Sequence, residues 1–482
     1  MIHFKVIFKI IGFLLILEGL FMLLGVPFSF YYQSDDIFVL LFSAVSVAVI
    51  GLILFLIARG DDRELRKKEG YIVVGMGWIV LSLFGAIPFV VHGCIPSYTD
   101  AFFETMSGFT TTGASILNNI EEMPKGLLFW RSATQWMGGM GMIVLSLAIL
   151  PILGIGGMQL FVAEVPGVTK DKIHPRVRET AKRLWGIYVL FTLSETLLLM
   201  LGGMSFYDAI NHSFTTMATG GYSTKQASIA YYTSPFIQYV IIFFMILAGM
   251  NFSLHYHILK GNFNAAKKDE EFRAYSGFII IATIVLTVAI AITGAFGVER
   301  SFRDSLFQIV SIVTTTGYVT ADYEAWGLVS KVFFFIILFV GGSAGSTGGG
   351  IKFVRHTLLL KNSWVELKRL IHPRAVIPLR FNGHAVTPNI IANIMAFFLF
   401  YIGIAGVGTL VMSVTGLELE SALGAVATSL GNVGPAIASV GPTSNFAHVS
   451  DFGKWFLSFL MLLGRLELFT ILILLSPSFW KK

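Results

Sequence analysis

Charged residues are scarce in this chain. Only 13% of its 482 residues are Asp, Glu, Lys or Arg, whereas 55% are hydrophobic. A typical soluble domain carries about 25% charged residues, and a soluble fold this poor in charge could not cover its own surface. The composition therefore excludes a large soluble globule. Apolar runs recur from end to end and are long enough to cross ~30 Å of hydrocarbon, which indicates a polytopic membrane protein.

Cysteine is nearly absent as well. Cys94 is the only one, which excludes an internal disulfide and a metal site built from clustered cysteines. Patterns typical of catalytic triads, zinc sites and acid–base pairs are missing, as are those of DNA- and RNA-binding proteins. We therefore expect no enzyme, no organic cofactor and no nucleic-acid partner. The apolar run after Lys5 and Lys9 lacks a signal-peptide cleavage site, so we expect it to be kept as the first membrane helix.

The basic residues gather in alternate loops. The net charge is +6, and most Lys and Arg lie at 59–68, 170–183, 260–273 and 352–380 or near the two ends. Such clusters mark cytoplasmic loops, so we expect both termini to be cytoplasmic and the number of spans to be even. The candidate spans, about ten, are 8–31, 38–59, 71–92, 127–150, 184–203, 234–258, 275–296, 328–360 (interrupted), 388–414 and 453–476.

Four shorter segments between the spans share one spacing. Each starts at or beside an acidic residue and ends 13 positions later in a glycine, at 100–113, 208–221, 304–317 and 421–434. One spacing in four places is typical of an internal repeat. About ten helical residues rise roughly 15 Å, half of a bilayer. Each unit therefore predicts a span, a half-helix, a glycine-containing loop and a second span.

The predicted loops have the chemistry of a cation path. A half-helix that ends at mid-depth exposes C-terminal carbonyls, whose partial negative charge favours a cation. The backbone after it cannot face lipid, because its polar groups would be unsatisfied, so it must line a watery path. Glycine readily adopts the positive φ that successive inward carbonyls can require. Four re-entrant loops with a purely structural role are the alternative.

The loop residues resemble the four degenerate filters of the Trk/Ktr/HKT superfamily of bacterial potassium-uptake proteins, and those of the TrkH type most closely. The matching segments are Thr111-Thr112-Gly113, Thr219-Gly220-Gly221-Tyr222, Thr315-Thr316-Gly317-Tyr318 and Asn432-Val433-Gly434-Pro435. The resemblance covers the whole chain, including a helix pair at about 8–59 ahead of the repeats. It implies an all-α integral membrane fold of about ten transmembrane helices plus four pore half-helices, with one fourfold pseudo-symmetric pore like that of a potassium channel.

The resemblance also implies a division of the chain and a location. An N-terminal helix pair at 1–69 precedes pore repeats at 70–160, 161–265, 266–375 and 376–482. The protein is expected in the bacterial inner membrane, in contact with lipid. It is expected as a homodimer in which each protomer has its own pore. A cytosolic nucleotide-binding regulatory subunit similar to TrkA is the expected partner.

The implied substrate is K⁺, with Rb⁺ and, weakly, Na⁺ also passing. In potassium channels, carbonyl oxygens replace the hydration shell of the ion. The resemblance assigns Gly113, Gly221, Gly317 and Gly434 to the backbone geometry, and because all four repeats keep glycine we favour potassium over sodium. The implied ligands are the carbonyls of Thr111, Thr112, Thr219, Gly220, Thr315, Thr316, Asn432 and Val433.

The eighth span is interrupted by glycine. Each glycine costs a helix roughly 1 kcal/mol, so the run at 341–350 should unwind it. The run matches the intramembrane gating loop of TrkH-like proteins; a static kink or close helix packing is the alternative. The residues expected to take part are Gly341, Gly342, Ser343, Gly345, Gly348, Gly349 and Gly350.

Arg465 lies in the last predicted span, where a charge is costly and usually functional. By resemblance it projects into the pore beneath the filter as an electrostatic barrier that also contacts the loop. A structural salt bridge with Glu467 or Glu195 is the alternative. Glu18 and Glu195 lie inside apolar spans, where a buried hydrogen-bonding role is favoured over ion passage.

Two rival functions remain open. A secondary transporter would couple K⁺ to H⁺ or Na⁺, and inverted repeats would support it. The four glycine clusters here share one orientation, which favours a pore. A membrane enzyme that binds an anionic substrate at the glycine run is the other rival, but Gly348-Gly-Gly-Ile-Lys352 lacks the spacing of a nucleotide-binding loop.

Overall fold

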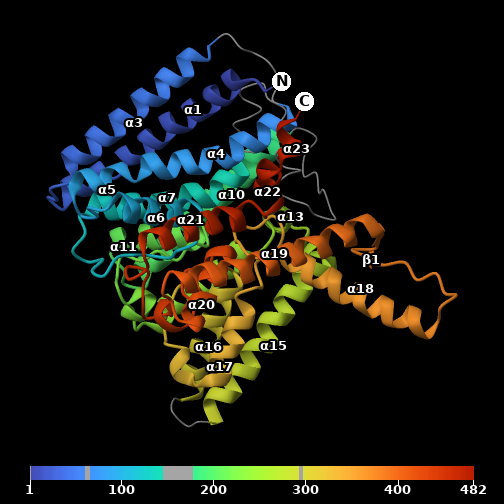
Figure 1. Ribbon diagram of the computed structural model, residues 1–482. Helices are drawn as coiled ribbons and strands as arrows, with labels where there is room; N and C mark the ends of the chain where they lie inside the picture. The colour runs from blue at the N-terminus through green and yellow to red at the C-terminus, as the bar shows by residue number, and fades with distance from the viewer. Residues whose placement is uncertain (1, 60–65, 145–176, 293–296, 482) are drawn as a thin grey trace.

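The computed structural model describes residues 2–59, 66–144, 177–292 and 297–481, and helices dominate it (Figure 1). The long helices are α1 (Phe4–Leu23), α3 (Ile37–Ile57), α4 (Lys67–Gly85), α7 (Lys125–Val144), α10 (Val177–Leu201), α12 (Pro235–Gly249), α15 (Glu270–Ile292), α18 (Phe353–Ile371), α19 (Pro388–Val414) and α21 (Asp451–Arg465). The short connecting helices are α2 (Val26–Tyr31), α5 (Ile87–His92), α13 (Phe252–Leu259), α14 (Phe263–Lys268), α17 (Leu328–Ile337), α22 (Phe469–Leu475) and α23 (Pro477–Trp480).

Four helices correspond to the repeated 13-residue spacing: α6 (Tyr98–Phe109), α11 (Phe206–Met217), α16 (Val298–Val313) and α20 (Leu419–Gly431). Three single 3₁₀ turns follow or connect them: η2 (Ser228–Tyr231), η3 (Glu324–Trp326) and η4 (Ala438–Val440). The strands in the described ranges are β1 (Arg380–Phe381) and β2 (His384–Ala385), which pair antiparallel.

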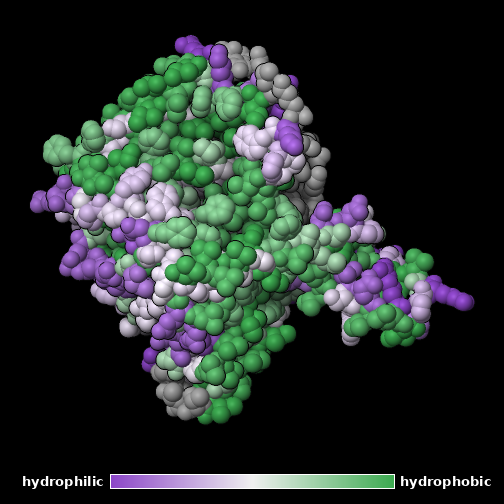
Figure 2. Space-filling view, viewed as in Figure 1, coloured by the Kyte–Doolittle hydropathy of each residue, from purple (hydrophilic) through white to green (hydrophobic). Residues whose placement is uncertain are grey.

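Six helical stretches of the described residues are long and apolar enough to cross a membrane, at Phe4–Tyr31, Ile37–Ile57, Lys68–His92, Lys182–Leu201, Glu270–Ile292 and Pro388–Val414. They match the predicted spans that begin at 8, 38, 71, 184, 275 and 388. Figure 2 shows the result at the surface, where hydrophobic residues cover α3 and α15. The exposed side chains of α15 include Ile280, Ile281, Ile284 and Val285, which is the surface expected of a helix in lipid.

Two predicted spans are sharply bent, which the sequence analysis did not anticipate. The span 234–258 divides into α12 and α13, which meet at 106°, and the span 453–476 divides into α21 and α22, which meet at 118°. Helix α12 ends where Met250 is extended, and Asn251 caps the next helix, because its Oδ1 accepts the Ser253 N–H at 2.8 Å. Glu467 and Leu468 both have positive φ, a conformation in which a right-handed helix cannot continue.

Several further predictions fall partly outside the described residues. Helix α7 follows the predicted span 127–150 as far as Val144, and positions 145–150 lie outside the described ranges. The same holds for 293–296, for part of the basic stretches 59–68 and 170–183, and for the boundary between repeats at 160 and 161. The span 328–360 is interrupted between α17 and α18, as predicted.

Both termini lie at one end of the molecule (Figure 1). The His3 N–H donates to Glu69 Oε1 at 2.9 Å, and Lys68 Nζ donates to the Phe479 carbonyl at 2.6 Å. Contacts at the start of α4 therefore link the first and last helices of the chain. At another edge, α18 projects from the body together with β1 (Figure 1), and it presents Leu360, Trp364 and Leu370 to the outside.

Helices α1 and α3 pack through reciprocal glycines. A Cβ atom on Gly12 would lie 2.5 Å from the Gly51 carbonyl oxygen, and one on Gly51 would lie 2.6 Å from the Gly12 carbonyl oxygen. No real Cβ approaches a backbone atom so closely. Because lipid provides no hydrophobic force between helices, such close backbone approach is a main source of their association. The pair at 1–69 is thus held by small residues.

Replacing Gly51 with leucine should destabilise this helix pair, since overpacking costs about 1–3 kcal/mol or more. We expect a lower midpoint of thermal unfolding in detergent. Gly406→Leu on α19 is the matched control, because an added Cβ there meets no atom within 4 Å. Equal midpoints for the two variants would contradict the packing role of Gly51.

Candidate functional site

The four glycine loops close into a ring. Each motif glycine lies against the backbone of the next loop along the chain, and the fourth lies against the first, so closely that an added Cβ would touch or overlap its neighbour. The atoms nearest to such a Cβ are the Gly220 oxygen for Gly113 (2.1 Å), the Thr316 oxygen for Gly221 (2.0 Å), the Gly434 nitrogen for Gly317 (2.8 Å) and the Gly113 oxygen for Gly434 (3.0 Å). Segments more than 300 residues apart in sequence are therefore joined.

Each half-helix ends in the same way. A residue just beyond its end takes positive φ: Thr111 (52°), Thr219 (54°) and Thr315 (58°) two positions after the last helical residue, and Asn432 (52°) directly after it. The next N–H then bonds back to a carbonyl five positions earlier, from Thr112 to Ser107, Gly220 to Thr215, Thr316 to Ser311 (all 2.8 Å) and Val433 to Thr428 (3.0 Å). This is a left-handed helix end, and it changes the direction of the backbone at the same point in each repeat.

The conformations of the glycines agree with expectation at three loops and differ at the fourth. Gly113, Gly221 and Gly317 have φ of 82°, 76° and 82°, values that favour glycine. Gly434 is not among the residues with positive φ. Its expected role in allowing a left-handed backbone is therefore wrong; what restricts its size is the contact with Gly113.

Hydrogen bonds from buried side chains hold the loops in place. The Thr and Asn side chains of the loops are fully buried. Asn432 Nδ2 donates to Thr112 Oγ1 at 3.0 Å and to the Met461 carbonyl at 2.8 Å, which ties the fourth loop to the first. The sequence analysis considered only the carbonyl of Asn432, since nothing local indicates that its amide reaches across 320 positions.

The Gly220 carbonyl already has a partner. Gln135 on α7 donates from Nε2 to this oxygen at 2.7 Å, and its Oε1 accepts the Tyr222 N–H at 3.0 Å. One amide therefore bonds to the backbone on both sides of Gly221. Among the expected ion ligands, Gly220 is one whose carbonyl is shared with a protein donor.

The glycine-rich run 341–350 lies directly against the ring. The Gly349 N–H donates to Thr315 Oγ1 at 2.7 Å, and a Cβ on Gly349 would lie 2.6 Å from the Cβ of Asn432. At its base the run is closed by the Gly341 N–H, which donates to the Ile351 carbonyl at 2.9 Å. It also reaches a neighbouring unit through the Ser343 N–H, which donates to the Gly249 carbonyl at 2.9 Å.

Thr347 anchors this run, and the sequence analysis missed it. Its Oγ1 donates to the Met217 carbonyl at 2.9 Å and lies 3.4 Å from Thr219 Oγ1. Arg465 Nη1 donates to the Thr347 carbonyl at 2.7 Å, and Nη2 donates to the Gly138 carbonyl at 3.1 Å. The arginine of the last span therefore contacts the loop. A threonine inside a glycine run was the available signal.

Other charges surround the loop. Lys352 Nζ donates to the Gly348 carbonyl, and Arg355 pairs with Glu467, which sits at the bend between α21 and α22. Glu271 Oε1 accepts the Ala344 N–H at 2.8 Å and the Val354 N–H at 3.0 Å. The loop is thus held at several points, and Glu467, one of the partners considered for Arg465, is engaged by Arg355.

Among the described residues, Glu18 does not show the hydrogen-bonding role that was favoured for it. Its side chain is fully buried, and neither carboxyl oxygen meets a hydrogen-bond partner among the described residues. Glu195 is equally buried. Neither carboxyl belongs to the ring of loops, so the described site does not use them.

Half-helices that end on a closed ring of loops, set among helices able to span a membrane, define an integral membrane protein of the ion-transport class. The chain belongs to the TrkH family of cation transport proteins, whose family model matches residues 38–482. The family consists of transport proteins, which confirms that the chain is not an enzyme.

Relatives match over their full length. The Trk system potassium uptake protein TrkH of Salmonella typhimurium is 40% identical over 484 residues, covering 100% of both chains. The Trk system potassium uptake protein TrkG of Escherichia coli K12 is 33% identical and covers 99% of each. The crystal structure of the potassium transporter TrkH from Vibrio parahaemolyticus matches 100% of both chains with a TM-score of 0.90 and 37% identity.

Proposed function

We propose that this chain is the membrane-embedded, ion-translocating subunit of a Trk-type potassium uptake system. The observation that carries the proposal is the closed ring of four loops, each preceded by a half-helix that directs its C-terminal end toward the ring. Partial negative charge from four helix ends favours a cation there. The names of the full-length relatives support potassium as that cation.

The filter consists of the backbone of the four loops, in a pathway with fourfold pseudo-symmetry. K⁺ and Rb⁺ pass through this filter. Na⁺ also passes, but weakly: each loop has a short filter sequence and supplies few coordinating carbonyls, so the filter does not exclude Na⁺ completely. Gly220 shares its carbonyl with Gln135, so we expect the second loop to bind the ion less tightly there. The proposed filter residues are Thr111, Thr112, Gly113, Thr219, Gly220, Gly221, Thr315, Thr316, Gly317, Asn432, Val433 and Gly434.

The run 341–350 and Arg465 form the gate. The hydrogen bonds from Gly349 to Thr315 and from Arg465 to Thr347 support this assignment, because they hold the run against the end of the filter. Opening then requires the loop to leave these contacts. A cytosolic nucleotide-binding subunit of the TrkA type controls the movement, and the relatives' description as parts of a Trk system supports such a partner.

The protein is a homodimer of the bacterial inner membrane with a pore repeat in each of the segments 70–160, 161–265, 266–375 and 376–482. Both termini are cytoplasmic. The contacts of Lys68 with Phe479 and of His3 with Glu69 support a common side for the two ends.

An uptake-deficient bacterium that expresses this chain should grow at low external K⁺. In vesicles held at constant voltage, ⁸⁶Rb⁺ entry should not change when the proton or Na⁺ gradient is varied, because a pore couples to neither. Entry that follows one of these gradients would instead favour the secondary transporter. Absence of growth and of Rb⁺ entry, with the protein present in the membrane, would overturn potassium transport itself.

A further inference from the structure

A buried ion pair stands beside the first two loops and was not expected from the sequence. Glu104 lies on the half-helix α6 and Arg131 on α7, and Arg131 Nε is 2.7 Å from Glu104 Oε1. The exposed fractions of the two side chains are 1% and 2%. Taking two charges out of water is costly, so a pair buried this completely in a membrane protein needs an explanation.

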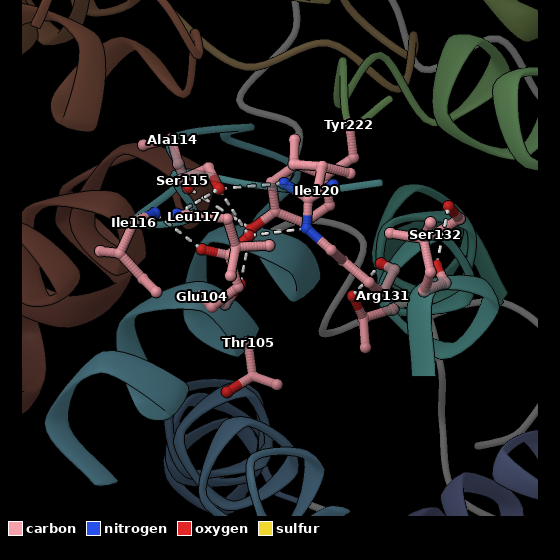
Figure 3. A network of polar contacts seen from close by, with 12 residues as sticks. Glu104, Thr105, Ala114, Ser115, Ile116, Leu117, Ile120, Arg131, Ser132 and Tyr222 are labelled. Carbon is pink, nitrogen blue, oxygen red and sulfur yellow. Dashed lines mark hydrogen bonds and ion pairs between the residues drawn. The ribbon is translucent and has the colours of Figure 1, made fainter. Parts of the chain in front are cut away.

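Glu104 fixes the chain that leaves the first loop. Its Oε2 accepts the Ile116 N–H at 2.9 Å, and its Oε1 accepts the Ser115 hydroxyl at 3.0 Å. Figure 3 shows these bonds converging on one carboxylate. With Arg131 the carboxylate accepts three hydrogen bonds, two of them from the residues that directly follow the filter segment. A neutral amide offers a single oxygen and cannot accept all of them in this geometry.

Arg131 connects the hydrogen bonds around Glu104 to the second loop. Its Nη2 donates to Ser115 Oγ at 3.1 Å, and its Nη1 donates to the Ser223 carbonyl at 3.2 Å. The guanidinium carbon lies 3.5 Å from the centre of the Tyr222 ring. The Tyr222 hydroxyl also contacts the half-helix α6, because it donates to the Glu104 backbone carbonyl at 2.6 Å. One guanidinium therefore spans the exits of two neighbouring loops.

The position of Glu104 recurs in the repeats. It is the fifth residue of the first motif, and His212, Gln308 and Ala425 are the fifth residues of the others. His212 Nε2 lies 2.9 Å from Ser223 Oγ, and Gln308 Nε2 donates to Thr320 Oγ1 at 3.2 Å. In three repeats this position thus braces the chain that follows the filter. Only in the first is it an acidic residue.

We propose that Glu104 and Arg131 are positioning residues that set the spacing between the first and second filter loops and thereby the preference for K⁺ over Na⁺. The inference rests on the proposed function. Both ions are monovalent, so discrimination depends on how well carbonyls held at a given spacing replace the water of each. A charged, hydrogen-bonded pair resists displacement of the loops more than neutral contacts do.

Glu104→Gln keeps the volume of the side chain but leaves one of the three donors without an acceptor. We expect the ratio of K⁺ to Na⁺ uptake in membrane vesicles to fall by about fivefold, the factor that corresponds to about 1 kcal/mol, the net contribution of a typical hydrogen bond. Arg131→Met should shift the ratio in the same direction. Because Arg131→Met alone leaves a buried carboxylate unpaired, the double variant E104Q/R131M is measured as well.

Lys454→Met is the matched control. Lys454 on α21 also pairs with α6, through Asp100 at 2.6 Å, and its side chain is also buried, but its second hydrogen bond goes to the Ala447 carbonyl and not to the residues that follow the first or second filter loop. It should lower the thermal unfolding midpoint without changing the ion ratio.

An unchanged ratio in E104Q and in the double variant, with wild-type transport intact, would overturn the positioning role alone. Failure of the wild type to transport K⁺ would instead overturn the proposed function.

Discussion

Alanine in place of Gly113 should abolish potassium uptake by this chain. The added Cβ would lie 2.1 Å from the Gly220 carbonyl oxygen, so it would push the first and second loops apart, whereas the Gly434 Cα at 3.5 Å would be in ordinary contact. A misplacement of about 1 Å in a positioned site can reduce a rate about a hundredfold. We expect a loss of this size in ⁸⁶Rb⁺ uptake at low external concentration.

Gly93 provides the control for this variant. Its φ is 85° against 82° for Gly113, so alanine introduces the same left-handed strain at both positions. An added Cβ on Gly93 meets no atom within 4 Å. Gly93→Ala should therefore introduce the backbone strain without the clash and leave uptake near the wild-type rate. Equal losses of uptake would mean that backbone strain, and not the ring of loops, explains the effect of Gly113→Ala.

The repeat and its half-helices could be predicted because their signals are local. Asp100 and Asp208 stand at helix starts, where the Ser97 and Ser205 side chains accept their N–H groups at 3.4 and 3.1 Å. The glycine of each motif follows its helix end at a nearly constant distance. Spans such as Pro388–Val414 were equally clear, because a continuous apolar run long enough to cross the bilayer needs no further context.

The bends between helices could not be predicted from the same signals. Residues 453–476 are apolar enough to predict one span, and the structure shows the break at Glu467 and Leu468, which have positive φ. The residues themselves have no strong preference for that conformation. The ion pair between Arg355 and Glu467 at this bend joins segments 112 positions apart, and a contact so distant leaves no periodic trace in the sequence.

The local sequence pattern predicts only part of the structure of the loops. It located the glycines correctly, yet three threonines adopt positive φ, which β-branched residues rarely do. Such strain persists only where surrounding contacts enforce it. Those contacts, such as Gln135 with Gly220 and Asn432 with Thr112, come from other repeats. The pattern therefore predicts which residues form the loops, but it does not predict the contacts that hold their backbone in this conformation.

Arg465→Ala should raise potassium flux, because it removes both a positive charge that we propose lies near the pathway and the hydrogen bond to the Thr347 carbonyl. Two unit charges about 8 Å apart repel by roughly 2 kcal/mol at an effective dielectric constant of about 20. Removal of a barrier of that size speeds passage roughly thirtyfold. Flux of ⁸⁶Rb⁺ into vesicles that contain the purified chain measures the change.

Thr347→Val weakens the anchoring of the loop without changing Arg465. Valine keeps the shape of the side chain and the carbonyl that accepts from Arg465, but it removes the hydrogen bond to the Met217 carbonyl. If the charge of Arg465 limits the flux, only Arg465→Ala raises it; if the anchoring of the loop limits the flux, both variants raise it. Ser346→Ala is the control, since the Ser346 hydroxyl has no hydrogen-bond partner among the described residues.

Deletion of 341–350 should raise the flux under either mechanism, because it removes the obstacle itself. Unchanged flux after the deletion would show that the run is a static kink.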